Sequence, residues 1–79
     1  MPLYYFDVRQ QDTLHEDEEG QELSNVEAAE TEAIAAAAAI AADLLPPRKR
    51  GEIAVEVRDE QREPVLVVRV ELRVARLKQ

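Results

Sequence analysis

The segment from residue 33 to residue 42 constrains the fold most, because eight of its ten residues are alanine and the other two are isoleucine. Alanine has the highest intrinsic helix propensity. Upstream, Ser24 and Glu27 have the spacing of a capping box, which marks the start of a helix. Downstream, Pro46 disfavours helical geometry in the residue before it. Together these signals predict one long helix over about residues 25–45.

Apolar residues within this predicted helix recur at steps of three and four, which predicts one buried stripe. Ile34 and Leu45 lie off that stripe, so we expect some apolar surface to be exposed in a monomer. The ten-residue apolar run is well short of the roughly 20 residues that a bilayer span needs. The stripe consists of Val26, Ala29, Ala33, Ala37, Ile40 and Leu44.

Alternation of apolar and polar side chains predicts four strands, two before the helix and two after it. A helix of about 20 residues and a strand of about nine residues both span about 30 Å. The helix can therefore lie along one face of an antiparallel sheet, in a two-layer α+β sandwich within a single domain of residues 1–79. The strands are predicted over about residues 3–9, 13–16, 52–58 and 64–74.

A core built from alanine is thin, because each alanine side chain buries little area. A chain of this size buries only about 60–65% of its unfolded surface. Small domains usually add disulfides, a metal or self-association, and this chain has no cysteine and one histidine. We therefore expect self-association, with most of the core supplied by the sheet residues Tyr4, Phe6, Val8, Ile53, Val55, Val57, Leu66, Val68 and Val70.

Charge is divided unevenly along the chain. Residues 1–45 carry a net charge of −10 and residues 46–79 a net charge of +3, which gives −7 in total. Phosphate backbones repel an acidic protein, so the composition disfavours general nucleic-acid binding. The basic portion permits a local exception, or pairing with the acidic half of a second copy.

The opening residues lack the pattern of a targeting signal, and the expected location is the cytoplasm.

Three features before the helix invite a functional interpretation. The acidic run of residues 16–19 lacks the spaced oxygen ligands of a calcium loop, so we interpret it as a solvated turn closed by Gly20. His15 has no serine, cysteine or second histidine placed to form a recognised catalytic signature, and we interpret it as an exposed strand residue. Tyr4 and Phe6 are expected in the core rather than on a base-stacking platform, because such platforms carry surrounding basic residues. We predict no catalytic residue, metal site or cofactor.

After the helix, Arg48, Lys49 and Arg50 form a candidate basic patch. With other C-terminal basic residues they could contact phosphate. The simpler interpretation, which we prefer, is that they offset the negative end of the helix dipole and aid solubility.

The final strand has the strongest binding signal, because its residues 65–68 are all apolar. Both faces must then be covered at this point, or the strand edge must be occupied, since an exposed apolar edge pairs readily with another chain. We expect a homodimer formed through this strand or through the alanine-rich helix. The candidate self-association residues are Val65, Leu66, Val67, Val68 and Val70.

The N-terminal half also resembles a known family. Met1–Phe6 with Val8, the turn Asp17–Gly20, Glu22–Leu23 and the helix residues Val26–Ala29 through Glu32–Ala33 are similar to a family of short, mostly alphaproteobacterial proteins classed as a domain of unknown function. This chain departs from the usual pattern at Gln10–Gln11, where a glycine turn is common. The resemblance implies the fold but no catalytic residue. The layout is also similar to that of HicB-type antitoxins, at the level of element order alone.

These features predict a small, non-enzymatic interaction or structural module that self-associates. An alternative is an antitoxin-like or regulatory protein whose acidic N-terminal half masks a basic partner protein. A hydrolase that uses His15 and the acidic turn is the least favoured of the three.

Overall fold

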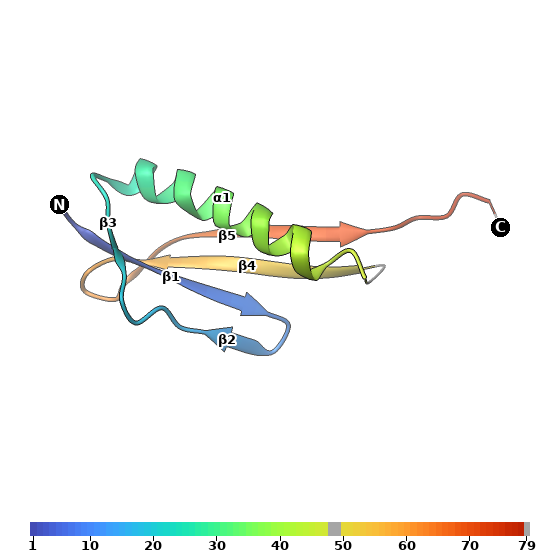
Figure 1. The fold of residues 1–79 in the computed structure, drawn as a ribbon, viewed down its shortest axis with the longest axis horizontal. Coiled ribbons are helices and arrows are strands. Elements are labelled where there is room, and N and C mark those ends of the chain that lie inside the picture. The colour runs from blue at the N-terminus through green and yellow to red at the C-terminus, as the bar shows by residue number, and fades with distance from the viewer. Residues whose placement is uncertain (48–49, 79) are drawn as a thin grey trace.

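The computed structural model describes residues 1–47 and 50–78, and it has one helix lying across one face of an antiparallel sheet (Figure 1). This confirms the predicted two-layer α+β architecture. The order is strand, strand, strand, helix, strand, strand, with one short strand more than predicted. The elements are β1 (Leu3–Gln10), β2 (Thr13–His15), β3 (Gln21–Glu22), α1 (Val26–Leu44), β4 (Arg50–Arg58) and β5 (Pro64–Arg73).

The sheet has the order β2-β1-β4-β5, and β3 also pairs with β1. In the register, Val55 lies opposite Val8 on one side and Val68 on the other. Residues directly opposite one another share a face of the sheet. The three apolar series of β1, β4 and β5 therefore point together at the helix, while the intervening, mostly charged residues form the outer face.

The predicted strand limits needed small corrections. β2 ends at His15 rather than at residue 16, β4 begins at Arg50 rather than at residue 52, and β5 ends at Arg73 rather than at residue 74. The two residues of β3 were missed, because a pair of polar residues carries no alternation signal. β2 and β3 both pair with β1, along its edge away from β4, and residues 16–20 form the break between them.

The helix is capped by Asn25, not by Ser24 as the capping-box spacing predicted. Asn25 has an extended backbone, and its Oδ1 accepts a hydrogen bond from the Ala28 N–H at 2.9 Å. Asparagine is at least as good an N-cap as serine, and this choice leaves Glu27 in the first turn, where the helix dipole favours a negative charge.

This capping arrangement predicts unequal effects of two neighbouring substitutions. Asn25→Ala removes the acceptor of a helix-end N–H and should lower the free energy of unfolding by about 1 kcal/mol. Ser24→Ala should change it by less than about 0.5 kcal/mol, as expected for an exposed residue without such a role. Urea denaturation followed by circular dichroism measures both. A larger loss from Ser24→Ala would restore the original capping-box assignment.

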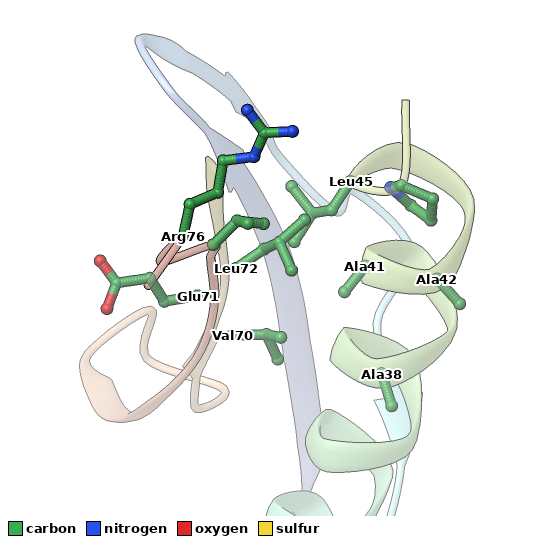
Figure 2. A pocket seen from close by; sticks show the side chains of 10 residues that line it. Ala38, Ala41, Ala42, Leu45, Val70, Glu71, Leu72 and Arg76 are labelled. Carbon is green, nitrogen blue, oxygen red and sulfur yellow. The ribbon is translucent and has the colours of Figure 1, made fainter. Parts of the chain in front are cut away.

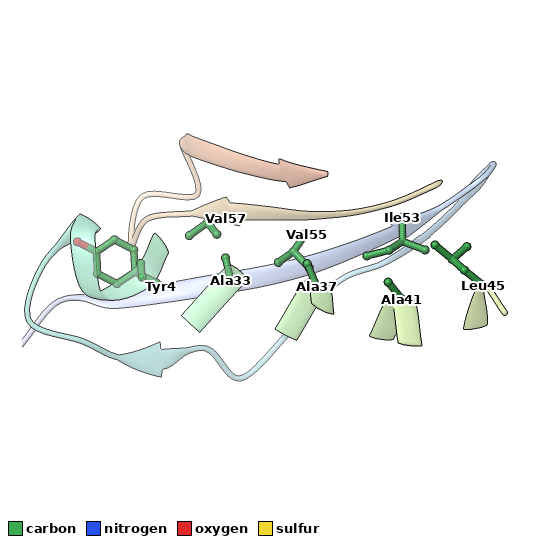
Figure 3. Close-up of a cluster of buried hydrophobic side chains, with 9 residues drawn as sticks. Tyr4, Ala33, Ala37, Ala41, Leu45, Ile53, Val55 and Val57 are labelled. Atoms are coloured by element: carbon green, nitrogen blue, oxygen red, sulfur yellow. The ribbon is translucent and has the colours of Figure 1, made fainter. Parts of the chain in front are cut away.

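Every fourth residue of α1 is buried against the sheet. In Figure 3, Ala33, Ala37 and Ala41 face Val57, Val55 and Ile53 of β4. All six are at most 7% exposed. Methyl side chains along a four-residue ridge let a helix approach its neighbour closely. The helix therefore acts as a thin cover, and the sheet supplies most of the core volume, as predicted.

The predicted helical stripe was only partly right. Val26 and Leu44 are exposed, at 44% and 38%. The buried row follows the four-residue steps Ala29, Ala33, Ala37 and Ala41, and Val26 and Leu44 lie on other sides of the helix. Ile40 is half-buried, and Ile34 is 51% exposed, as expected.

Leu45, expected to be exposed, is instead buried at 6%. Its side chain folds under the end of the helix against the start of β4. A Cβ atom at Gly51 would lie 2.8 Å from Leu45 Cδ2. Glycine at residue 51 thus leaves the space that Leu45 occupies.

The resulting molecule is long and thin. Its principal extents are 53 × 23 × 18 Å, with a radius of gyration of 14.3 Å, against about 12 Å for a compact domain of this length. Its accessible surface is 5899 Å², whereas a compact monomer of this mass exposes about 4800 Å². The extended tail after β5 contributes part of this excess (Figure 1). The rest reflects a core covered by a single helix.

Candidate interaction surface

The last strand forms one edge of the sheet. β5 pairs with β4 from Pro64 to Arg73, with one register shift opposite Val57 and Arg58, and no other strand of the described residues pairs with its far side. The backbone N–H and C=O groups on that far side are therefore available to another strand. At ten residues, β5 is longer than an average strand of about five or six, so it offers a long edge for pairing.

The five predicted self-association residues lie together on this edge strand but divide between its two faces. Leu66, Val68 and Val70 point toward the helix and are half-buried. Val65 and Val67 point to the outer face and are 37% and 42% exposed. The continuous apolar run therefore arises because its helix-facing members belong to the core and its outer members are left on the surface.

An apolar groove runs between β5 and the second half of α1 (Figure 2). Its volume is about 850 Å³. Val70 and Leu72 point across it toward the helix, whereas Glu71 points away (Figure 2). The alanines of α1 leave this space, because they are too short to reach the strand. Its lining includes Ala38, Ala42, Leu45, Val70, Leu72 and Val74.

The outer face of the sheet carries rows of charge. Arg9 Nε lies 2.7 Å from Glu56 Oε2, and Arg73 Nε lies 3.0 Å from Glu71 Oε2. Glu52 and Glu71 are directly opposite each other in β4 and β5. Like charges in that position destabilise a sheet. Arg69 lies opposite Ala54 and forms no ion pair within 4.0 Å among the described residues.

A second polar cluster joins β1, β4 and the loop before β3. Asp7 is 2% exposed and accepts a hydrogen bond from the Asp17 N–H at 2.9 Å. Arg58 Nη2 donates to Asp7 Oδ1 at 3.2 Å. Arg58 Nε is 2.7 Å from Asp7 Oδ2 but is poorly aligned for a hydrogen bond, so this second contact is an ion pair. The hydrogen bond to Asp7 is the main cause that raises the pKa of Arg58.

Asp17 closes the break between β2 and β3. Its carboxylate accepts hydrogen bonds from the N–H groups of Phe6, Glu19 and Gly20 at 3.1, 3.1 and 3.2 Å. Burial acts to raise the pKa of the Asp17 carboxyl, but these three donors outweigh it and hold the pKa below its usual value. Asp17 thus takes the place of the missing strand partner of Phe6. The interpretation of the whole acidic run as solvated was wrong at this residue.

The other sequence candidates lie apart from one another. His15 is an exposed residue at the end of β2, as expected. Tyr4 is buried and Phe6 packs against the core, which confirms their predicted role. Tyr5 points to the outer face, where the Arg62 guanidinium lies 4.5 Å from its ring centre.

Of the predicted basic patch, Arg48 and Lys49 lie outside the described residues. Arg50 is exposed at the start of β4, directly opposite Arg73 of β5.

Within residues 1–47 and 50–78, no three side chains of histidine, cysteine, aspartate or glutamate gather as a metal ion would require. In the same part of the chain, no helix combines the length and apolar character of a membrane span.

The geometry thus defines a small two-layer α+β domain with an open strand edge beside an apolar groove. Residues 3–71 match the model of the family described as Domain of unknown function (DUF6894), and the chain belongs to this family. The match extends through β4 and most of β5, beyond the N-terminal residues that carried the resemblance. No curated protein and no solved structure matches the chain.

Proposed function

We propose that the chain is a non-enzymatic, self-associating module that docks a second copy of itself on the open edge of β5. The observation that carries this proposal is the coincidence of three features at one place. They are an unpaired strand edge, exposed valines on its outer face and an apolar groove on its helix face. Pairing two such edges would join two sheets into one and remove both edges from water.

The size of the surface supports a second copy as the occupant. The accessible surface of 5899 Å² exceeds that of a compact monomer by about 1100 Å². A standard interface buries about 800 Å² on each partner. Docking of a second copy along β5 would therefore cover an area of the same order as this excess, part of which belongs to the tail after β5.

Sedimentation equilibrium over the micromolar range tests this proposal. We expect a particle of about twice the chain mass of 8.9 kDa. A chain that stays at 8.9 kDa at several hundred micromolar would contradict the proposal. In that case the antitoxin-like alternative, in which the acidic residues 1–45 cover a basic protein, becomes the better account.

A charged substitution on the edge should weaken the dimer. Val67 is 42% exposed on β5, so Val67→Lys leaves the core intact and places an amine at each side of the interface. We expect the dissociation constant to rise at least tenfold, which corresponds to about 1.4 kcal/mol. The matched control is Leu14→Lys, at a residue 38% exposed on β2 at the opposite edge of the sheet. Equal weakening by both variants would show that net charge, not the β5 edge, controls association.

A further inference from the structure

We infer that the two β5 strands pair antiparallel with Val70 of each copy on the two-fold axis. In this register Arg69 of each copy lies opposite Glu71 of the other. The inference rests on the proposed self-association and adds to it the one register that the charges on β5 select. In a symmetric dimer each residue pair off the axis occurs twice, whereas a residue on the axis meets its own copy once, so the Arg69–Glu71 pair is obtained twice in this register.

The neighbouring registers are less favourable. An axis at Arg69 puts the two Arg69 side chains opposite each other, and an axis at Glu71 does the same for the two Glu71 side chains. Like charges directly opposite destabilise a sheet, and opposite charges stabilise it. An axis at Val68 instead sets Arg69 against Val67 and gives no charge pair.

An axis at Leu72 sets Glu71 against Arg73 of the second copy. β5 ends at Arg73, so this register pairs only residues 71–73 within the strands. The register centred on Val70 pairs residues 67–73. Glu71 also already has an ion pair with Arg73 of its own chain, at 3.0 Å. The Val70 register is therefore the one that combines charge pairing with a long overlap.

The outer face of the monomer shows why such pairing is useful. Glu71 lies directly opposite Glu52 of its own sheet, and Arg69 lies opposite the small, uncharged Ala54. Pairing around Val70 brings Arg69 of the second copy to the free side of Glu71. Arg69 of each copy, which has no ion pair among the described residues, then gains one. The repulsive Glu52–Glu71 pair of each copy gains a neighbouring cation.

The helix face fits the same register. Val70 meets its own copy, Val68 meets Leu72, and Leu66 meets Val74, so every contact on this face is apolar. Val74 is 60% exposed in the single chain, just past the end of β5, and this contact would cover it. The second strand also lies beside the groove, next to Ala38 and Ala42 of α1.

Two charge reversals test the register. Arg69→Glu gives a chain with two acidic residues at positions 69 and 71, and Glu71→Arg gives a chain with two basic residues there. Each variant alone places like charges opposite each other twice, so we expect its dissociation constant to rise at least tenfold. Mixed in equal amounts, the two variants form a heterodimer in which both pairs are again oppositely charged. Its dissociation constant should lie within about threefold of that of the unchanged chain.

Native mass spectrometry and sedimentation equilibrium of the single variants and their mixture give the result. The controls Arg9→Glu and Glu18→Arg make the same changes of net charge away from β5, and they should leave the dimer unchanged when separate or mixed. Two chains that fail to fold cannot restore a dimer by mixing, so the mixture also excludes misfolding. Restoration should also occur in the double variant Arg69→Glu/Glu71→Arg.

Each other outcome has a definite meaning. If the unchanged chain is a monomer, the self-association itself is wrong. If it is a dimer that neither single variant weakens, or one that mixing does not restore, self-association stands and the Val70 register is overturned.

Discussion

Asp7→Ala should lower the free energy of unfolding by about 2 to 3 kcal/mol. The substitution leaves the Arg58 guanidinium and the Asp17 N–H without the carboxylate that they share. Breaking a fully buried ion pair costs about 3 to 5 kcal/mol. The expected loss is smaller here, because the Arg58 side chain is 20% exposed and retains a contact with Glu16 at 3.4 Å. The melting temperature should fall by at least about 8 °C.

Glu16→Ala is the matched control for this prediction. Glu16 contacts the same arginine, but its side chain is 58% exposed, and surface ion pairs of this kind contribute little. We expect a change below about 0.5 kcal/mol. Thermal and urea unfolding of both variants make the comparison. Equal effects would mean that Arg58 and Asp17 find other partners when Asp7 is removed.

Ala37→Leu should lower the free energy of unfolding by about 3 kcal/mol, the upper end of the usual cost of overpacking a core. Ala37 is 0% exposed and faces Val55 across the helix–sheet interface (Figure 3). A leucine there must push the helix away from β4 or take a strained rotamer, because Val55 is also 0% exposed and has no room to move.

The control for the helix variant is the same substitution on the opposite face. Ala39 is exposed on α1, so Ala39→Leu should change the free energy of unfolding by less than about 0.5 kcal/mol. Urea denaturation measures both. If Ala37→Leu were also neutral, the alanine row would not set the distance between helix and sheet, and the account of a thin core would lose its basis.

The main elements of the fold follow from signals that are local in the sequence. The alanine run before Pro46 predicts α1, and strict alternation at Ile53, Val55 and Val57 predicts β4 and its buried face. The end of the helix was harder, because the burial of Leu45 depends on the missing side chain of Gly51. That relation joins two residues across a turn, and no periodic pattern carries it.

The polar cluster could not be predicted for the same reason. Asp7 and Arg58 are 51 residues apart, and they meet only because β1 pairs with β4. Asp17 looked like one member of a solvated acidic run, whereas its carboxylate accepts a hydrogen bond from the N–H of Phe6 at the break between β2 and β3. A clue was present at Asp7, a charged residue among the apolar residues 3–8 of the opening strand, but its partner depends on the strand order.

The edge position of the last strand fits its sequence pattern, whereas its role in self-association stays a prediction. Four consecutive apolar residues in the last strand indicated that both faces or the edge must be covered, and the structure places that strand at an edge. The groove beside it was not predicted, because it depends on how far Ala38 and Ala42 stand from Val70 and Leu72.

Hydrogen exchange of the β5 backbone amides, followed by NMR at low and high protein concentration, tests the central claim most directly. In a single chain, alternate amides of an edge strand face water and exchange fast, while the others bond to the neighbouring strand. We predict that the fast set, within residues 67–73, becomes protected as concentration rises, while amides of the opposite edge strand β2 do not change. Fast exchange of alternate β5 amides in a sample shown to be dimeric would contradict the docking of two copies through this edge.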